Sequence, residues 1–229
     1  MEKEFIIVQN QFVQNTDDYS YREQFVYILL SSMRDDLFKV TTTSVDMLAS
    51  ILGLSLHSKN RAVVKEMISS MEEKGLISLY EDVMKTKPVD LSKIKVSNAY
   101  SIDVKDVEID SLDKSFTKVD IKDLLKFIGL DDKGKELSFS VYFNIIRRIF
   151  DNEYNRRYSF PSIETISKET GINRKTIMKH LKLLMDNEIL YYETVSLGKY
   201  KDKNLYSKWD NKQCVSDAVA QIECGLMDI

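Results

Sequence analysis

The pattern of apolar positions between residues 160 and 192 predicts two helices joined by a tight turn. Ser162 stands where its hydroxyl would cap the first helix, because serine accepts a hydrogen bond from an orphan N–H of the first turn. Ile163 and Ile166 then fall on one face at helical spacing. Gly171 follows, and glycine ends helices readily because it adopts the left-handed conformation without a Cβ clash.

A second helix is predicted from residue 174 to about residue 187, capped by Asn173. Its buried stripe is spaced at i, i+4 and i+7 and consists of Ile177, Leu181 and Leu184. The opposite face is basic and carries Arg174, Lys175, Lys179 and Lys182. A helix anchored by one apolar stripe and basic on the outside suits the major groove of duplex DNA.

A β-hairpin is predicted directly after the second helix. Residues 189–194 and 204–209 are rich in strand-forming residues. The tip between them carries Lys199, Lys201 and Lys203, which we expect to contact phosphates or the minor groove. A hairpin in this position is a wing.

The segment resembles a winged helix-turn-helix of the type found in bacterial and phage regulators and replication proteins. The resemblance rests on the pattern P-S-I-E-x-I-S-x-E-T-G-I-N-R-K-T-I, which begins at Pro161. It implies double-stranded DNA as the partner. The expected DNA-binding residues are Asn173, Arg174, Lys175, Thr176, Lys179, Lys182, Lys199, Lys201 and Lys203. Arginine and lysine pair with guanine O6 and N7, and asparagine reads adenine.

Residues 44–80 repeat the same pattern, with five extra residues in the turn. The equivalent pairs are Ser44 and Ser162, Leu48 and Ile166, Gly53 and Gly171, Leu54 and Ile172, Val64 and Ile177, Ile68 and Leu181, Met71 and Leu184, and Leu76 and Ile189. We interpret this as a second winged helix, with helices at 44–53 and 59–74 and a strand at 76–80. Its second DNA or partner surface would comprise Lys59, Asn60, Arg61 and Lys65, among which Glu66, Glu72 and Glu73 are interspersed.

The predicted fold is therefore mainly α with small β-wings, in two tandem winged-helix domains. The domains are an N-terminal winged helix at 1–85, a strand-bearing wing or linker at 86–117, a C-terminal DNA-binding winged helix at 118–212, and a helix or tail at 213–229. Further elements are expected as a strand within 4–14 and helices at 19–33, 119–128 and 139–150. The helix expected within 213–229 either packs on its own domain or pairs with another subunit.

A tandem pair of winged helices in a chain of this size resembles the plasmid and phage replication initiators of low-GC Gram-positive bacteria. The resemblance implies that the two domains grip repeated sites at an origin, and that dimer and monomer have different roles. Three functions are weighed: a replication initiator or accessory replication protein of a mobile element, a transcriptional regulator (repressor), and an interaction module that recruits replication proteins.

Charge is distributed unevenly along the 229 residues. The net charge is −3, yet residues 141–212 hold 14 Lys/Arg and 9 Asp/Glu and so carry +5. Affinity for a polyanion depends on such a local patch more than on the total. With 43% hydrophobic residues the chain can form packed cores, and it contains no apolar run of the ~18 residues that a membrane helix needs. We expect a cytoplasmic protein associated with the nucleoid or a plasmid.

Catalytic and cofactor motifs were weighed and rejected. Residues 129–136, GLDDKGKE, spell G-x-x-x-x-G-K but continue with Glu136 where a phosphate-binding loop needs Ser or Thr. They are expected to form an interhelical loop. His57 and His180 have no partners spaced for a triad or a metal pair, and Cys214 and Cys224 form no zinc set. The sequence therefore predicts no enzyme activity, no metal and no cofactor.

Overall fold

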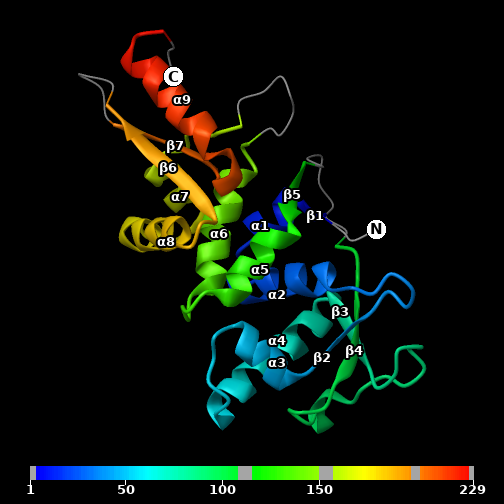
Figure 1. Ribbon diagram of the computed structural model, residues 1–229. Helices are drawn as coiled ribbons and strands as arrows, with labels where there is room; N and C mark the ends of the chain where they lie inside the picture. The colour runs from blue at the N-terminus through cyan, green and yellow to red at the C-terminus, as the bar shows by residue number, and fades with distance from the viewer. Residues whose placement is uncertain (1–3, 108–114, 150–156, 197–201, 227–229) are drawn as a thin grey trace. The chain divides into compact units, whose positions relative to one another are not determined.

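The chain forms two compact units, residues 1–136 and 137–229. The computed structural model describes residues 4–107, 115–149, 157–196 and 202–226 (Figure 1). Helices predominate, and the described strands form three small antiparallel sheets. No helix among the described residues has the length and apolar character to cross a membrane.

The first unit contains a three-stranded sheet, a separate two-stranded sheet and several helices. Its elements are β1 (Phe5–Gln9), α1 (Asn10–Gln14), α2 (Tyr21–Ser32), β2 (Thr41–Thr43), α3 (Val45–Ile51), α4 (Ser58–Glu73), β3 (Ile77–Tyr80), a 3-10 turn (Leu91–Lys93), β4 (Tyr100–Val104), β5 (Phe116–Asp120) and α5 (Ile121–Gly129). The sheet has the order β2-β4-β3, and β1 pairs with β5.

Helix α2 is the central helix of the first unit. Its inner face includes Phe25, Ile28 and Leu29, which are buried. At its start, the Ser20 hydroxyl accepts a hydrogen bond from the backbone N–H of Glu23 while the Glu23 carboxylate accepts one from the backbone N–H of Ser20. The same carboxylate accepts two hydrogen bonds from Lys74 of α4, at 2.8 and 2.9 Å. This pair ties the beginning of α2 to the end of α4.

Two predicted elements of this unit differ in detail. The strand predicted within 4–14 is β1, which ends at Gln9, and the short helix α1 follows it. Asn10 accounts for the change, since its backbone N–H bonds to the Ser115 carbonyl and its side chain bonds to Thr117 of β5. The helix predicted at 119–128 begins at Ile121. On this helix Leu124 and Phe127 are buried, whereas Leu125 is 62% exposed.

The predicted domain boundary at residue 118 also differs from the observed units. It falls inside β5, whose Lys118 lies opposite Ile7 of β1. Strand β4, which was expected in a wing or linker, is the central strand of the first sheet. Strands β4 and β5 therefore both belong to the first unit, which ends at Glu136. Backbone pairing between strands distant in sequence produces this difference.

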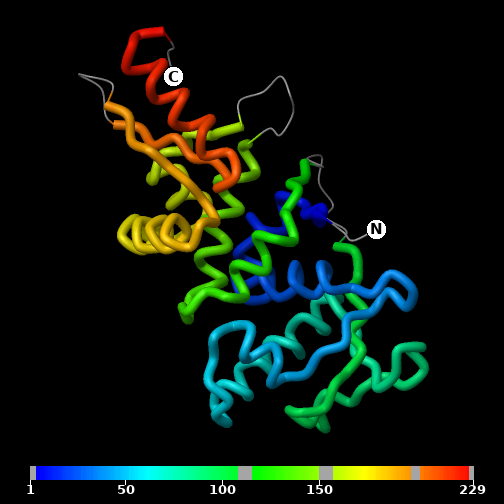
Figure 2. The backbone as a smooth tube through the Cα atoms, in the orientation of Figure 1, coloured from blue at the N-terminus to red at the C-terminus, as the bar shows by residue number. Residues whose placement is uncertain are grey.

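The second unit contains the helix-turn-helix and the hairpin. Its elements are α6 (Lys135–Ile146, which begins two residues before the boundary), α7 (Ile163–Thr170), α8 (Arg174–Asp186), β6 (Leu190–Val195), β7 (Lys203–Lys208), a 3-10 turn (Trp209–Asn211) and α9 (Lys212–Glu223). Helix α6 is the apolar core helix that the sequence predicts, shifted toward the N-terminus, with Phe139, Phe143 and Ile145 buried. Strands β6 and β7 run side by side as the orange hairpin of Figure 2. They pair antiparallel, with Tyr192 opposite Tyr206.

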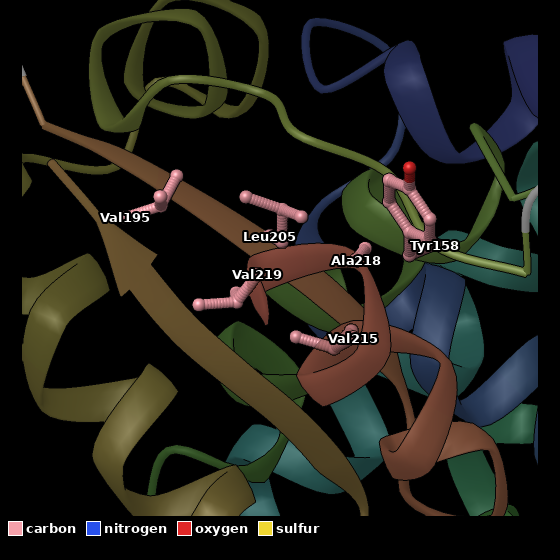
Figure 3. Packing of buried hydrophobic residues seen from close by; sticks show 6 residues of the cluster. All are labelled: Tyr158, Val195, Leu205, Val215, Ala218 and Val219. Atoms are coloured by element: carbon pink, nitrogen blue, oxygen red, sulfur yellow. The ribbon is translucent and has the colours of Figure 1, made fainter. Parts of the chain in front are cut away.

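Helix α9 packs against the hairpin of its own unit. Val215, Ala218 and Val219 of the helix meet Val195 and Leu205 of the two strands, and Tyr158 closes the same cluster (Figure 3). Of the two arrangements considered for the last helix, the structure shows this one. One face of the hairpin is therefore committed to the core.

Candidate nucleic-acid interface

The turn between α7 and α8 has a backbone that only glycine adopts without strain. Gly171 has φ of 70°, in the left-handed region, and its N–H bonds to the Ser167 carbonyl at 2.9 Å. At the other end of α7, the Ser162 hydroxyl accepts a hydrogen bond from the N–H of Thr165 at 3.0 Å. Both predicted helix ends are thus observed.

The corner after Gly171 is fixed by a buried side chain and two hydroxyl groups. Ile172 is 5% exposed. The Ser167 hydroxyl donates to the Ile172 carbonyl at 2.7 Å, and the Thr170 hydroxyl donates to the Ile166 carbonyl at 2.7 Å. The first bond ties the turn residue Ile172 back to α7, and the second lies within the last turn of α7.

The inner face of α8 is the predicted stripe. Ile177, Leu181 and Leu184 are fully buried. His180 is also buried, with its Nδ1 2.8 Å from the hydroxyl of Ser138 on α6. The imidazole therefore anchors α8 on α6 and does not line the outer face. At the beginning of α8, Oδ1 of Asn173 accepts a hydrogen bond from the N–H of Thr176 at 2.9 Å, as expected for a cap.

The outer face of α8 is cationic and open to solvent, and its basic residues Arg174, Lys175, Lys179 and Lys182 are all exposed. Arg174 Nη1 lies 3.1 Å from Glu164 Oε1, and Lys182 Nζ lies 2.9 Å from Asp186 Oδ2. In both pairs the two side chains are more than half exposed, so the pairs are weak and a phosphate can compete for the cation. The hydrogen bond to Asp186 raises the pKa of Lys182, so this ammonium stays charged.

The remaining predicted contacts lie at the edges of this face. Thr176 is half-buried. Lys203, at the start of β7, is half-buried and its Nζ lies 5.7 Å from the centre of the Phe160 ring. Lys199 and Lys201 lie outside the described residues. The structure therefore brings together the α8 residues of the predicted site and places one of its three wing lysines.

Two exposed apolar residues of this region were not predicted as site residues. Met178 is 44% exposed on α8, and Phe160, just before the first turn of α7, is 43% exposed. The sequence did contain a signal for Met178, because it lies four residues after Arg174 and outside the stripe formed by Ile177 and Leu181.

Arg147 and Arg148 follow the last turn of α6. Both guanidinium groups hydrogen-bond the Glu169 carboxylate of α7, which also accepts from Asn144 at 2.9 Å. Burial alone would raise the pKa of Glu169, but the hydrogen bonds from Arg148, Asn144 and Arg147 outweigh it and lower the pKa to about 2. The cluster holds α7 against α6.

Most of the candidate surface in the first unit is engaged within that unit. Arg61 binds Asp46 through two hydrogen bonds of 2.7 and 2.9 Å, and Lys65 donates to the Ile94 carbonyl at 2.6 Å. Asn60 donates to the Ser55 carbonyl at 2.9 Å, whereas Lys59 is exposed. This surface is less available to a polyanion than the outer face of α8.

The interhelical loop predicted at 129–136 is observed at 130–134, between α5, which ends at Gly129, and α6, which begins at Lys135. Lys135 is 3% exposed, and its ammonium donates to the carbonyl of Ile128 at 2.6 Å. Burial lowers the pKa of this lysine. The ammonium is thus used to satisfy the carboxyl end of α5.

Comparison with known proteins agrees with this geometry. Residues 150–190 match the model of a family described as "Helix-turn-helix domain". No curated protein matches the chain. The match covers α7, the turn, and α8. The chain thus contains a helix-turn-helix domain, which supports DNA binding.

Proposed function

We propose that this protein binds specific sequences of double-stranded DNA by placing α8 in the major groove. The observation that carries the proposal is the solvent-open cationic face of α8, on a helix that is capped by Asn173 and held by a fully buried stripe. A rigid helix with exposed Arg and Lys can approach base edges and phosphates without rearranging its own core.

The residues of this face have different expected roles. Arg174 and Lys175, in the first turn, are placed to pair with guanine O6 and N7. Lys179 and Lys182 lie further along the helix, and Lys182 is assigned to a phosphate. Lys203, with Lys199 and Lys201, is assigned to phosphates or the minor groove beside the hairpin, which adds affinity without sequence information.

Charge reversal on α8 tests the proposal. The K175E/K179E variant should lose at least ~tenfold in duplex affinity, since each good base or phosphate pair contributes ~1–3 kcal/mol. The measurement is fluorescence anisotropy on duplex DNA selected from a random pool. Both lysines are exposed and so the fold should persist, which circular dichroism checks.

A matched control is available in the first unit. Lys93 and Lys133 are exposed, and K93E/K133E changes the net charge by the same amount away from α8. This control should bind duplex like the unaltered protein. Equal affinity of K175E/K179E and K93E/K133E would contradict the proposed interface.

The biological role proposed for this binding is that of a cytoplasmic replication initiator or accessory replication protein of a plasmid, phage or other mobile element. A transcriptional regulator uses the same binding mode and is an equal candidate. Footprinting separates the two: protection of tandem direct repeats near an origin favours the initiator, and protection of one palindrome over a promoter favours the regulator.

We further propose that residues 44–80 form a second winged helix. Several local features support the repeat. Ser44 caps α3 as Ser162 caps α7. The φ angle is 69° at Gly53 and 70° at Gly171, so both glycines are left-handed. The turn that follows the second helix of each copy is also alike. The N–H of Leu76 donates to the Met71 carbonyl at 2.9 Å, and the N–H of Ile189 donates to the Leu184 carbonyl at 2.9 Å.

A second candidate function follows for this repeat. Arg61 and Lys65 are held by groups of the first unit, which favours a protein partner over DNA at this position. The candidate is an interaction module that recruits replication proteins. The K175E/K179E variant, whose duplex affinity should be reduced, can be used to pull down replication proteins. Their capture by this variant would separate protein recruitment from DNA binding.

A further inference from the structure

Met178 has an apolar side chain that the core of the second unit leaves partly exposed to solvent. Its neighbour Ile177 and the residues Leu181 and Leu184 are fully buried and complete the inner stripe of α8. Successive residues of an α-helix point about 100° apart. Met178 therefore leaves the inner face and remains 44% exposed on the flank of α8.

The surroundings of Met178 are cationic. Arg174 lies one turn before it and Lys182 one turn after it, and both side chains are more than half exposed. A phosphate-binding role does not use an apolar side chain at this point. In the major groove, however, one base edge presents an apolar group, the C5-methyl of thymine, which apolar side chains contact.

We propose that Met178 determines sequence specificity by packing on the C5-methyl of a thymine. The inference rests on the proposed entry of α8 into the major groove. Met178 lies four residues after Arg174, which is ~6 Å along the helix. That length is one to two base steps of ~3.4 Å. The thymine should thus lie one or two steps from the base that Arg174 contacts.

Deoxyuridine provides the sharpest test, because it differs from thymidine only by the missing methyl group. Each thymine of a duplex selected from random DNA is replaced in turn, and the dissociation constant is measured by fluorescence anisotropy. For the unaltered protein, replacement at one thymine should weaken binding by about threefold to fivefold, the factor expected for one buried methyl-sized group.

The Met178→Ala variant completes a double-mutant cycle with the DNA. It should bind the thymine-containing site about threefold to fivefold more weakly and be insensitive to deoxyuridine at that position. Met178→Leu, which keeps an apolar side chain of similar size, should retain most of the sensitivity. Because residue 178 is exposed, circular dichroism should show that both variants are folded.

The outcomes separate this inference from the function on which it rests. If the unaltered protein binds its selected duplex but tolerates deoxyuridine at every thymine, the role of Met178 is refuted and DNA binding stands. The same holds if Met178→Ala remains as sensitive as the unaltered protein. If no duplex is bound saturably, both proposals fail.

Discussion

At the scale of single residues, Glu169 is a charged group that stabilises the contact between two helices. Its carboxylate accepts hydrogen bonds from Arg147, Arg148 and Asn144 and is only partly exposed. The two arginines belong to a segment rich in positive charge, yet they are used to join α6 to α7. Among the described residues, the exposed cations of the proposed DNA-binding surface are therefore those of α8.

The Glu169→Gln variant should lower the free energy of unfolding of the second unit by ~1–3 kcal/mol at pH 7, because hydrogen bonds to charged groups contribute about that much. Urea denaturation followed by the fluorescence of Trp209, the single tryptophan of the sequence, would measure the change. Glu164→Gln on the same helix is the control, since its pair with Arg174 is exposed. A Glu169→Gln variant as stable as this control would contradict the structural role.

The pH dependence follows from the same residue. The pKa of Glu169 is about 2 in the folded protein, below its ordinary value of 4.5. A lowered folded-state pKa adds stability that is complete above pH 4.5 and is lost as the pH falls from there toward 2. Glu169→Gln should remove this part of the acid sensitivity. An unchanged slope of stability against pH in this window would count against the pairing.

At the scale of elements, the beginning of α8 contains one residue, Asn173, with two expected roles, one in the fold and one in DNA recognition. Asn173 was expected both to cap the helix and to read adenine. The structure uses its Oδ1 for the cap, in a hydrogen bond of 2.9 Å from Thr176. A bidentate contact to adenine needs both Oδ1 and Nδ2. The cap therefore competes with base reading at this residue.

Substitution of Asn173 distinguishes the two roles. Serine preserves a cap but removes the amide, so Asn173→Ser should keep both stability and duplex affinity close to those of the unaltered protein. Asn173→Ala removes the cap and should cost about 1 kcal/mol of stability. Denaturation and anisotropy on the same samples would measure both quantities. A large loss of affinity in a stable Asn173→Ser variant would show that the amide touches DNA.

The hairpin and α9 form the second important element pair. Val215, Ala218 and Val219 cover one face of β6 and β7 (Figure 3). A two-stranded hairpin is marginally stable alone, so packing against a helix is what makes it a fixed part of the unit. The wing proposed to contact DNA is thus supported on one face by α9.

At the scale of the whole molecule, charge separates the two units. Residues 1–136 contain 19 Lys/Arg and 24 Asp/Glu, whereas residues 137–229 contain 14 and 12. The net charges are therefore −5 and +2. The first unit should repel a polyanion on average, while the second attracts it. This asymmetry favours a single DNA-reading helix in each chain.

Salt dependence should count the phosphates that each unit contacts. The logarithm of the association constant falls with the logarithm of salt by about 0.9 for each neutralised phosphate. Lys182→Glu should reduce the magnitude of this slope by about one or more. Lys59→Glu, the matched change in the first unit, should leave it unaltered. An equal reduction by Lys59→Glu would show that both units grip the duplex, and a flat titration would contradict a phosphate interface.

The sequence by itself determined the helix-turn-helix. Its signals are local: the caps Ser162 and Asn173, the left-handed Gly171, and the periodic stripe of Ile177, Leu181 and Leu184 depend on residues within a few turns of one another. Such signals act through backbone sterics and helical spacing, which any short stretch of chain expresses. The family match to residues 150–190 agrees with this prediction.

Only the tertiary structure decided the domain boundary and the use of the buried charges. The pairing of β1 with β5 joins residues more than a hundred positions apart, and nothing in either strand specifies its partner. Nor does the local sequence specify the pairing of Glu169 with Arg147 or of His180 with Ser138, which are 22 and 42 positions apart. Long-range partners are selected by packing, because each side chain gains its partner only when distant helices meet. Which cations remain exposed at the surface is therefore a property of the folded chain.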